Sequence, residues 1–160
     1  MHSHIKPCGL WYEFDGSWRD WCQSEMPDWI ANRWLYRVET DPSCNILRIE
    51  GVEQFLLFNQ EYLTKTALAV AMEEQGISPS RMERGIEWRR VAERYDGIEI
   101  NPYLWHFRHN MDTMWYYGWD CASGCLWRPK GTVLELMYRL DGAGDNPIKM
   151  PKRRGFRVEA

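Results

Sequence analysis

The sequence has no apolar run long enough to cross a membrane, and no apolar core of a signal peptide follows its start. We therefore expect a cytoplasmic protein. It also has no internal repeat and no low-complexity segment. Its 160 residues suffice for one domain with a core of its own. We expect that domain to span residues 1–140, with a basic, loosely ordered tail over residues 141–160.

Cysteines are few, and their number and spacing argue against a disulfide framework. The five lie at irregular intervals, at Cys8, Cys22, Cys44, Cys121 and Cys125. Two of them are four residues apart, and His106 and His109 precede them, a faint likeness to a zinc site. No Cys-x-x-Cys pair is present, so reduced, partly buried thiols are the favoured interpretation and no metal is expected.

An excess of positive charge is absent as well. The chain has 20 Lys and Arg against 23 Asp and Glu, a formal charge of −3, so no basic field draws it to nucleic acid. Arginines and lysines gather within residues 81–94 and 149–157, where such runs most often face solvent. A partner with an acidic patch stays open. Single-stranded nucleic-acid binding by stacked rings is less favoured because of the negative charge.

Aromatic residues, in contrast, are plentiful. Ten Trp, eight Tyr and five Phe make up 14% of the chain, which indicates either a broad aromatic core or a surface for stacking. Residues 115–127 set one acid, Asp120, among Trp and Tyr rings. The rings could simply be core and the acid a turn former. Alternatively, Asp120 could stabilise charge on a sugar while the rings hold a planar, cationic leaving group, which makes it the first candidate catalytic residue.

The order of expected elements indicates an α+β domain. Alternation and turn residues predict strands at 5–14, 34–39, 45–49, 98–100, 125–127 and 132–138. Helical spacing predicts helices at 17–25, one or two within 51–75, and another that starts at 78–80. The turn at residues 41–43 predicts a hairpin between its flanking strands. The long connection over 101–118 is a candidate functional loop.

Several stretches, taken in order, resemble the ADP-ribosyltransferase fold in its compact bacterial and phage forms, which include a phage anti-CRISPR form. They are the strand at 6–14 with the helix that follows it from Ser17, then residues 35–38, 46–47, 86–100 and 120–127. The resemblance implies a split, mixed β-sheet with helices between two groups of strands. It implies NAD as the cofactor and either transfer of ADP-ribose to a macromolecule or hydrolysis of NAD, in phage or bacterial conflict inside a host cytoplasm. The acceptor could be a protein or a nucleic acid, and a protein is favoured.

The resemblance also assigns roles. His4 or Lys6 would hold the adenosine side of NAD, and Tyr12 or Trp18 would stack on nicotinamide. Asp120 would engage the nicotinamide ribose. Cleavage of the nicotinamide–ribose bond passes through an oxocarbenium-like state, so a carboxylate beside the ribose gains interaction as charge builds. Stacking on the cationic ring contributes on the order of 0.5 to 2 kcal/mol.

Three more residues complete the candidate site. Trp119 and Ser123 flank Asp120 closely and are expected to contribute to NAD binding. Glu99 is the rival catalytic carboxylate, because alternation within Ile98-Glu99-Ile100 points it away from the face of its apolar neighbours. The same alternation also fits an ordinary strand residue that faces solvent.

A second hypothesis needs no catalysis. The His-Gly-Thr-like run of the family's first strand is missing here. The chain could therefore be a phage-type inhibitor or adaptor that keeps the fold and binds a host protein through its Trp-rich face and arginine clusters.

Overall fold

The computed structural model describes residues 6–140, 147–149 and 156–158, and it confirms the α+β class. One sheet is mixed. It has the strand order β1 (Leu10–Glu13), β7 (Ser123–Leu126), β6 (Gly97–Ile100) and β3 (Ile46–Ile49). The β3–β6 pair is parallel, and the other two pairs are antiparallel. We call it the first sheet.

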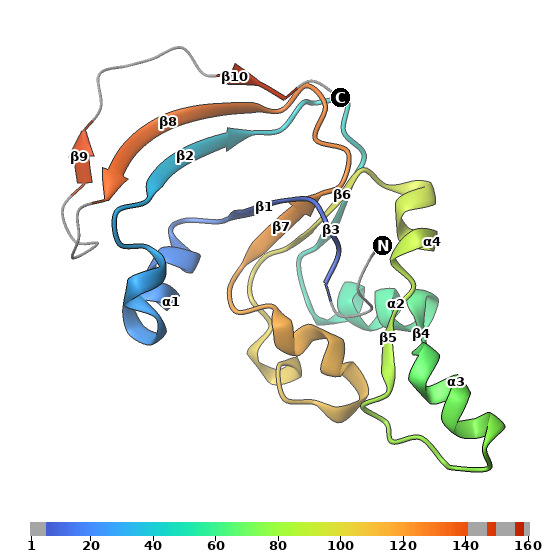
Figure 1. Ribbon diagram of the computed structural model, residues 1–160. Helices are drawn as coiled ribbons and strands as arrows, with labels where there is room; N and C mark the ends of the chain where they lie inside the picture. Colours follow the sequence, from blue (N-terminus) through green and yellow to red (C-terminus); the bar gives the residue numbers. More distant parts are fainter. Residues whose placement is uncertain (1–5, 141–146, 150–155, 159–160) are drawn as a thin grey trace.

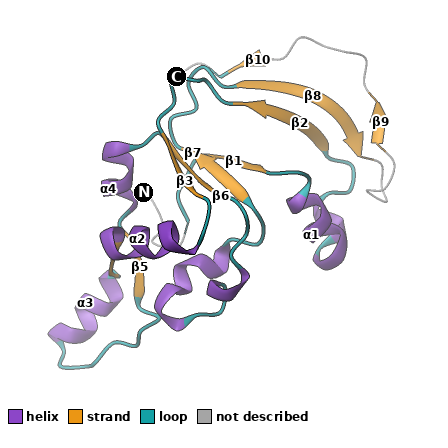
Figure 2. Cartoon of the chain, turned by 180° about the vertical axis from the view of Figure 1, so that it is seen from behind, coloured by secondary structure: helices purple, strands orange, loops and turns teal. Residues whose placement is uncertain are grey.

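The second sheet is antiparallel and is built around the long strand β8 (Val133–Leu140). Strands β2 (Trp34–Glu39), β9 (Pro147–Lys149) and β10 (Phe156–Arg157) pair with it. In both views β2 lies between β8 and the first sheet (Figures 1 and 2). The tail that was expected to be loosely ordered thus contributes two short strands, and its remaining residues lie outside the described part except Val158.

Helices lie mainly on the side of the first sheet that faces away from β2 and β8 (Figure 2). They are α2 (Val52–Tyr62), α3 (Ala67–Glu74) and α4 (Trp88–Arg94), with a two-stranded pair of β4 (Leu63–Lys65) and β5 (Arg84–Ile86) beside them. Helix α1 (Ser17–Glu25) and the 3-10 turn η1 (Pro27–Trp29) lie at the end of β1. None of the helices in the described residues is both long and apolar enough to span a bilayer.

The core is aromatic. It fills the space between the first sheet, α2, α4 and the 3-10 segment η3 (Met111–Gly118). Phe55, Trp115 and Tyr116 are almost fully buried there, and their rings lie 5.0 to 5.6 Å apart in stacked or edge contacts. Most rings of the sequence run before Asp120 therefore serve packing rather than ligand stacking.

Two element predictions are wrong. The expected hairpin of 34–39 with 45–49 does not form, because β2 pairs with β8 whereas β3 pairs in parallel with β6. Strand β3 buries Ile49 in the aromatic core and Ile46 outside that cluster, while β2 buries no side chain fully and fits an outer sheet. The helix expected from 78–80 begins only at Trp88, because residues 84–86 form a strand with β4 instead.

The connection over 101–118, expected to be a loop, forms the 3-10 segments η2 (Trp105–Phe107) and η3. Its backbone bonds are largely local, as in the Thr113 N–H to Asn110 carbonyl bond at 3.0 Å. Trp115 and Tyr116 of this segment pack into the core, and the segment ends at Gly118, two residues before Asp120.

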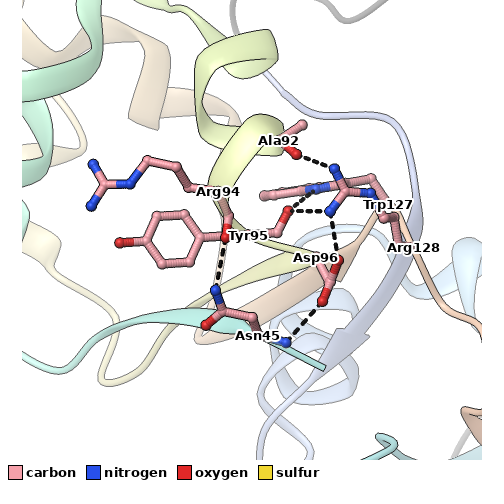
Figure 3. A network of polar contacts seen from close by, with 7 residues as sticks. All are labelled: Asn45, Ala92, Arg94, Tyr95, Asp96, Trp127 and Arg128. Carbon is pink, nitrogen blue, oxygen red and sulfur yellow. Dashed lines mark hydrogen bonds and ion pairs between the residues drawn. The ribbon is translucent and has the colours of Figure 1, made fainter. Parts of the chain in front are cut away.

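A polar network joins the end of α4 to β7 (Figure 3). The Arg128 guanidinium donates to the carbonyls of Ala92 and Tyr95 and to the Asp96 carboxylate at 2.6 Å. The Trp127 indole N–H also donates to the Tyr95 carbonyl, at 2.7 Å. Arg128 thus satisfies carbonyls at the C-terminal end of α4, where a cation also suits the helix dipole.

We expect Arg128→Ala to lower the free energy of unfolding by about 1–2 kcal/mol at pH 7, a modest value because the guanidinium is half exposed. The hydrogen bond from Arg128 lowers the pKa of Asp96 below its usual 3.8. That stabilisation is complete above pH 3.8 and is lost as pH falls through the folded-state pKa. Urea unfolding at pH 7 and at pH 3 measures both effects, with Arg89→Ala as an exposed control. Equal stability of wild type and Arg128→Ala at pH 7 would contradict the expectation.

Candidate active site

A cleft of about 990 Å³ separates the two sheets. Its size falls in the range of cofactor and small-molecule sites. It is lined by every residue from Leu10 to Gly16 and by Leu35 to Val38. Consecutive lining residues place the edges of β1 and β2 at the cleft, because side chains alternate between the faces of a strand. Each of these two strands is terminal in its sheet within the described residues. The lining also includes Glu99 of β6 and Leu134, Met137 and Tyr138 of β8, so the cleft extends over inner strands of both sheets.

Six of the eight predicted site residues line this one cleft, although the sequence separates them widely. They come from the start of the described chain, β1, α1, β6 and the entry to β7: Lys6, Tyr12, Trp18, Glu99, Asp120 and Ser123. The fold therefore gathers residues that the sequence nominated one by one.

The other two predicted site residues, Trp119 and His4, are not among the described residues that line the cleft. Trp119 is fully buried and its ring packs against Trp11, Trp115 and Tyr116. It belongs to the aromatic core and leaves no face open to a ligand. His4 lies outside the described residues.

Glu99 projects from the middle of the first sheet into the cleft, between the fully buried Ile98 and Ile100 as alternation predicts. Its side chain is 13% exposed, and both oxygens have partners. The Tyr12 hydroxyl donates to Oε1 at 2.7 Å, and Arg48 Nε donates to Oε2 at 2.9 Å. Burial and this hydrogen bond raise the pKa of Tyr12 well above its usual value, so its hydroxyl stays a donor.

Asp120 lies between η3 and β7, with its side chain 20% exposed. Arg108 Nη2 donates to its Oδ1 at 3.2 Å. The other oxygen, Oδ2, has no hydrogen-bond partner among the described residues, so it can accept one from a ligand. Asp120 and Glu99 thus differ, since only Asp120 keeps an oxygen available.

A third carboxylate, Glu13, was not singled out from the sequence. It accepts the backbone N–H groups of Trp18 and Arg19, the latter at 3.2 Å, at the start of α1. A carboxylate at a helix N-terminus satisfies donors that would otherwise lack partners. Burial nevertheless raises the pKa of Glu13. Both bonds are to Oε2, so Glu13 fixes the start of α1 beside the cleft through one of its oxygens.

Ser123 and the nearby Cys125 are both buried. Ser123 is buried and its hydroxyl donates to the Cys121 carbonyl at 3.1 Å. Burial raises the pKa of the Cys125 thiol to about 12, so a thiolate nucleophile is disfavoured there. In the part of the chain that the structure describes, no group of three or more His, Cys, Asp or Glu is placed to hold a metal ion.

The remaining lining combines rings with cations. Trp18 stacks on Trp21 with centroids 5.0 Å apart, and Tyr36 enters from the second sheet. The Lys6 ammonium lies 4.8 Å from the centroid of one Trp11 ring, and Arg19 also lines the cleft. Carboxylates, rings and cations together suit a ligand that has a planar group, a sugar and phosphates.

Comparison with models of protein families, with curated proteins and with solved structures gave no match to this chain. The chemistry of the cleft is therefore argued from its own residues.

Proposed function

We propose that the protein is an NAD-dependent ADP-ribosyltransferase that modifies a macromolecular target. The observation that supports it is the convergence on one cleft of Asp120, Glu99, Tyr12, Trp18, Lys6 and Ser123. The resemblance assigns Asp120, Tyr12, Trp18 and Lys6 to one site, whereas alternation nominates Glu99 and closeness to Asp120 nominates Ser123. The proposed architecture is the family's split sheet, with the cleft between its two parts.

The cleft residues fit NAD. Its volume is of the order that such a ligand occupies, and Trp18 and Tyr36 offer rings for the planar groups. Three cations line the cleft and would neutralise the negative phosphates of NAD: Lys6, Arg19 and Arg37. NAD would supply a reactive glycosidic bond to nicotinamide. Asp120 would face the ribose, where a fixed carboxylate favours developing positive charge.

The test is direct. Purified protein is incubated with NAD, and nicotinamide release is followed by chromatography, with and without cell lysate as a source of acceptor. NAD carrying a label on its adenosine half then shows by mass spectrometry whether label joins protein or nucleic acid. We expect protein. No binding or consumption of NAD under any of these conditions would overturn the proposal.

A second candidate is a non-catalytic adaptor, and a partly exposed aromatic cluster supports it. Trp29 is 52% exposed, and its ring contacts the half-buried rings of Trp18 and Trp21, which pack against Cys22, Ile30 and Leu140. Tryptophan is enriched at protein-binding surfaces. A partner recovered by tagged wild type and by Asp120→Asn, but lost by Trp29→Ser, would favour this function. Recovery that Trp29→Ser does not alter would contradict it.

A further inference from the structure

Arg108 is unusual among the arginines of this protein. Its side chain is 17% exposed, whereas the other arginines that form ion pairs in the described residues are 39% or more exposed. Arginine is rarely buried unless it is well paired. Yet Arg108 Nε is buried and has no hydrogen-bond partner among the described residues.

Aromatic rings hold the guanidinium in place. Its carbon lies 5.9 Å from the ring centroid of Trp105 and 5.6 Å from that of Tyr117. Both distances are within the range of cation–π attraction. The two rings come from η2 and η3, so the segment over 101–118 surrounds the guanidinium with aromatic side chains.

Stability does not explain this arrangement. Taking an ion pair largely out of water costs about as much as its attraction returns, and the unpartnered Nε adds to that cost. The charge pair between Arg108 and Asp120 is the one ion pair of this buried arginine in the described residues. Because Arg108 is retained despite this cost, we expect it to serve the group that it binds, which is the Asp120 carboxylate at the cleft.

We propose that Arg108 is the positioning residue of Asp120. It holds Oδ1 from behind, which fixes the plane of the carboxylate and leaves Oδ2 directed to the ligand. This inference rests on the proposed transferase function. It adds that the catalytic acid is oriented by a stacked guanidinium from outside the cleft, since Arg108 itself does not line the cleft.

The test uses Arg108→Ala, Arg108→Lys and the control Arg81→Ala, which removes an exposed arginine paired with Asp112 on η3. We expect Arg108→Ala to lower kcat for nicotinamide release at least about tenfold, with KM changed less than about threefold. Arg108→Lys should recover only part of kcat, because an ammonium lacks the planar fork. Arg81→Ala should match wild type.

Chemical rescue separates positioning from a merely structural role. Guanidinium at a non-denaturing concentration should occupy the vacated space beside the two rings and raise kcat of Arg108→Ala, and it should not raise that of wild type or Asp120→Asn. Wild-type kcat in Arg108→Ala, or a loss that guanidinium does not reverse, would overturn the proposal.

A crystal structure of Arg108→Ala gives a readout that does not depend on turnover. We expect the Asp120 carboxylate to leave its wild-type orientation, and to regain it in crystals soaked with guanidinium. An unmoved carboxylate would overturn the positioning role whether or not the wild type consumes NAD. If the carboxylate moves while the wild type releases no nicotinamide, the positioning stands and the transferase function fails.

Discussion

Asp120→Asn is expected to reduce nicotinamide release at least about 100-fold, which corresponds to about 2.7 kcal/mol of transition-state stabilisation. The amide has nearly the shape of the carboxylate and can still accept the bond from Arg108 Nη2 through its oxygen. It lacks the negative charge that would favour a cationic ribose. Initial rates of nicotinamide release over a range of NAD concentrations measure the loss.

Two controls define what that loss means. The melting temperature of Asp120→Asn should fall, because the largely buried Arg108 loses its charge partner, so turnover is compared at a temperature at which circular dichroism shows both proteins folded. Glu99→Gln should cost less than about tenfold in kcat, because both Glu99 oxygens are already engaged by Tyr12 and Arg48. Should Asp120→Asn keep wild-type turnover while Glu99→Gln loses it, catalysis belongs to Glu99 and our assignment is wrong.

Trp115→Ala is expected to have the largest effect on folding, lowering the free energy of unfolding by about 3–5 kcal/mol. Its indole is 1% exposed and packs against Phe55 and Phe58 with centroids 5.6 Å away. Its Nε1 also donates to Asn59 Oδ1 at 2.7 Å, so removal leaves a buried amide oxygen unpaired. Total stabilities near 5–15 kcal/mol leave little margin after such a loss.

Urea unfolding followed by circular dichroism measures this effect. Trp115→Phe should lose less, about 1–2 kcal/mol, since it keeps a ring and forfeits the hydrogen bond. Trp34→Ala is the matched control, because that Trp is about half exposed on β2, and we expect a change under about 1 kcal/mol. Comparable losses at positions 34 and 115 would show that Trp115 does not anchor the core.

Local signals in the sequence predict much of this fold. Gly16 with a positive φ and Ser17 mark the start of α1, and alternation identifies β2 at the residues where it is found. Pairing is a different matter, because it depends on contacts far apart in the chain. The turn at residues 41–43 predicts that β3 pairs with β2, but β3 pairs in parallel with β6 and places Ile49 in the core.

The site shows the same division. Alternation alone placed Glu99 on the face opposite Ile98 and Ile100, and the structure confirms it. Trp119 was expected at the site because it precedes Asp120 in the sequence. The two side chains diverge, however, since Trp119 packs into the core and Asp120 lines the cleft. No signal marked Arg108, since its pairing with Asp120 arises from the fold of η2 and η3.

The cleft walls belong to two sheets that share no hydrogen-bonded ladder in the described residues. Nothing in the strand pairing therefore sets the spacing of the walls, and modest rotation of one sheet against the other would widen or narrow the opening. A bound dinucleotide that contacts both walls would hold the two sheets at a fixed separation. Part of its binding energy would then go into immobilising the second sheet, so a change that fixed the two sheets beforehand would raise the affinity.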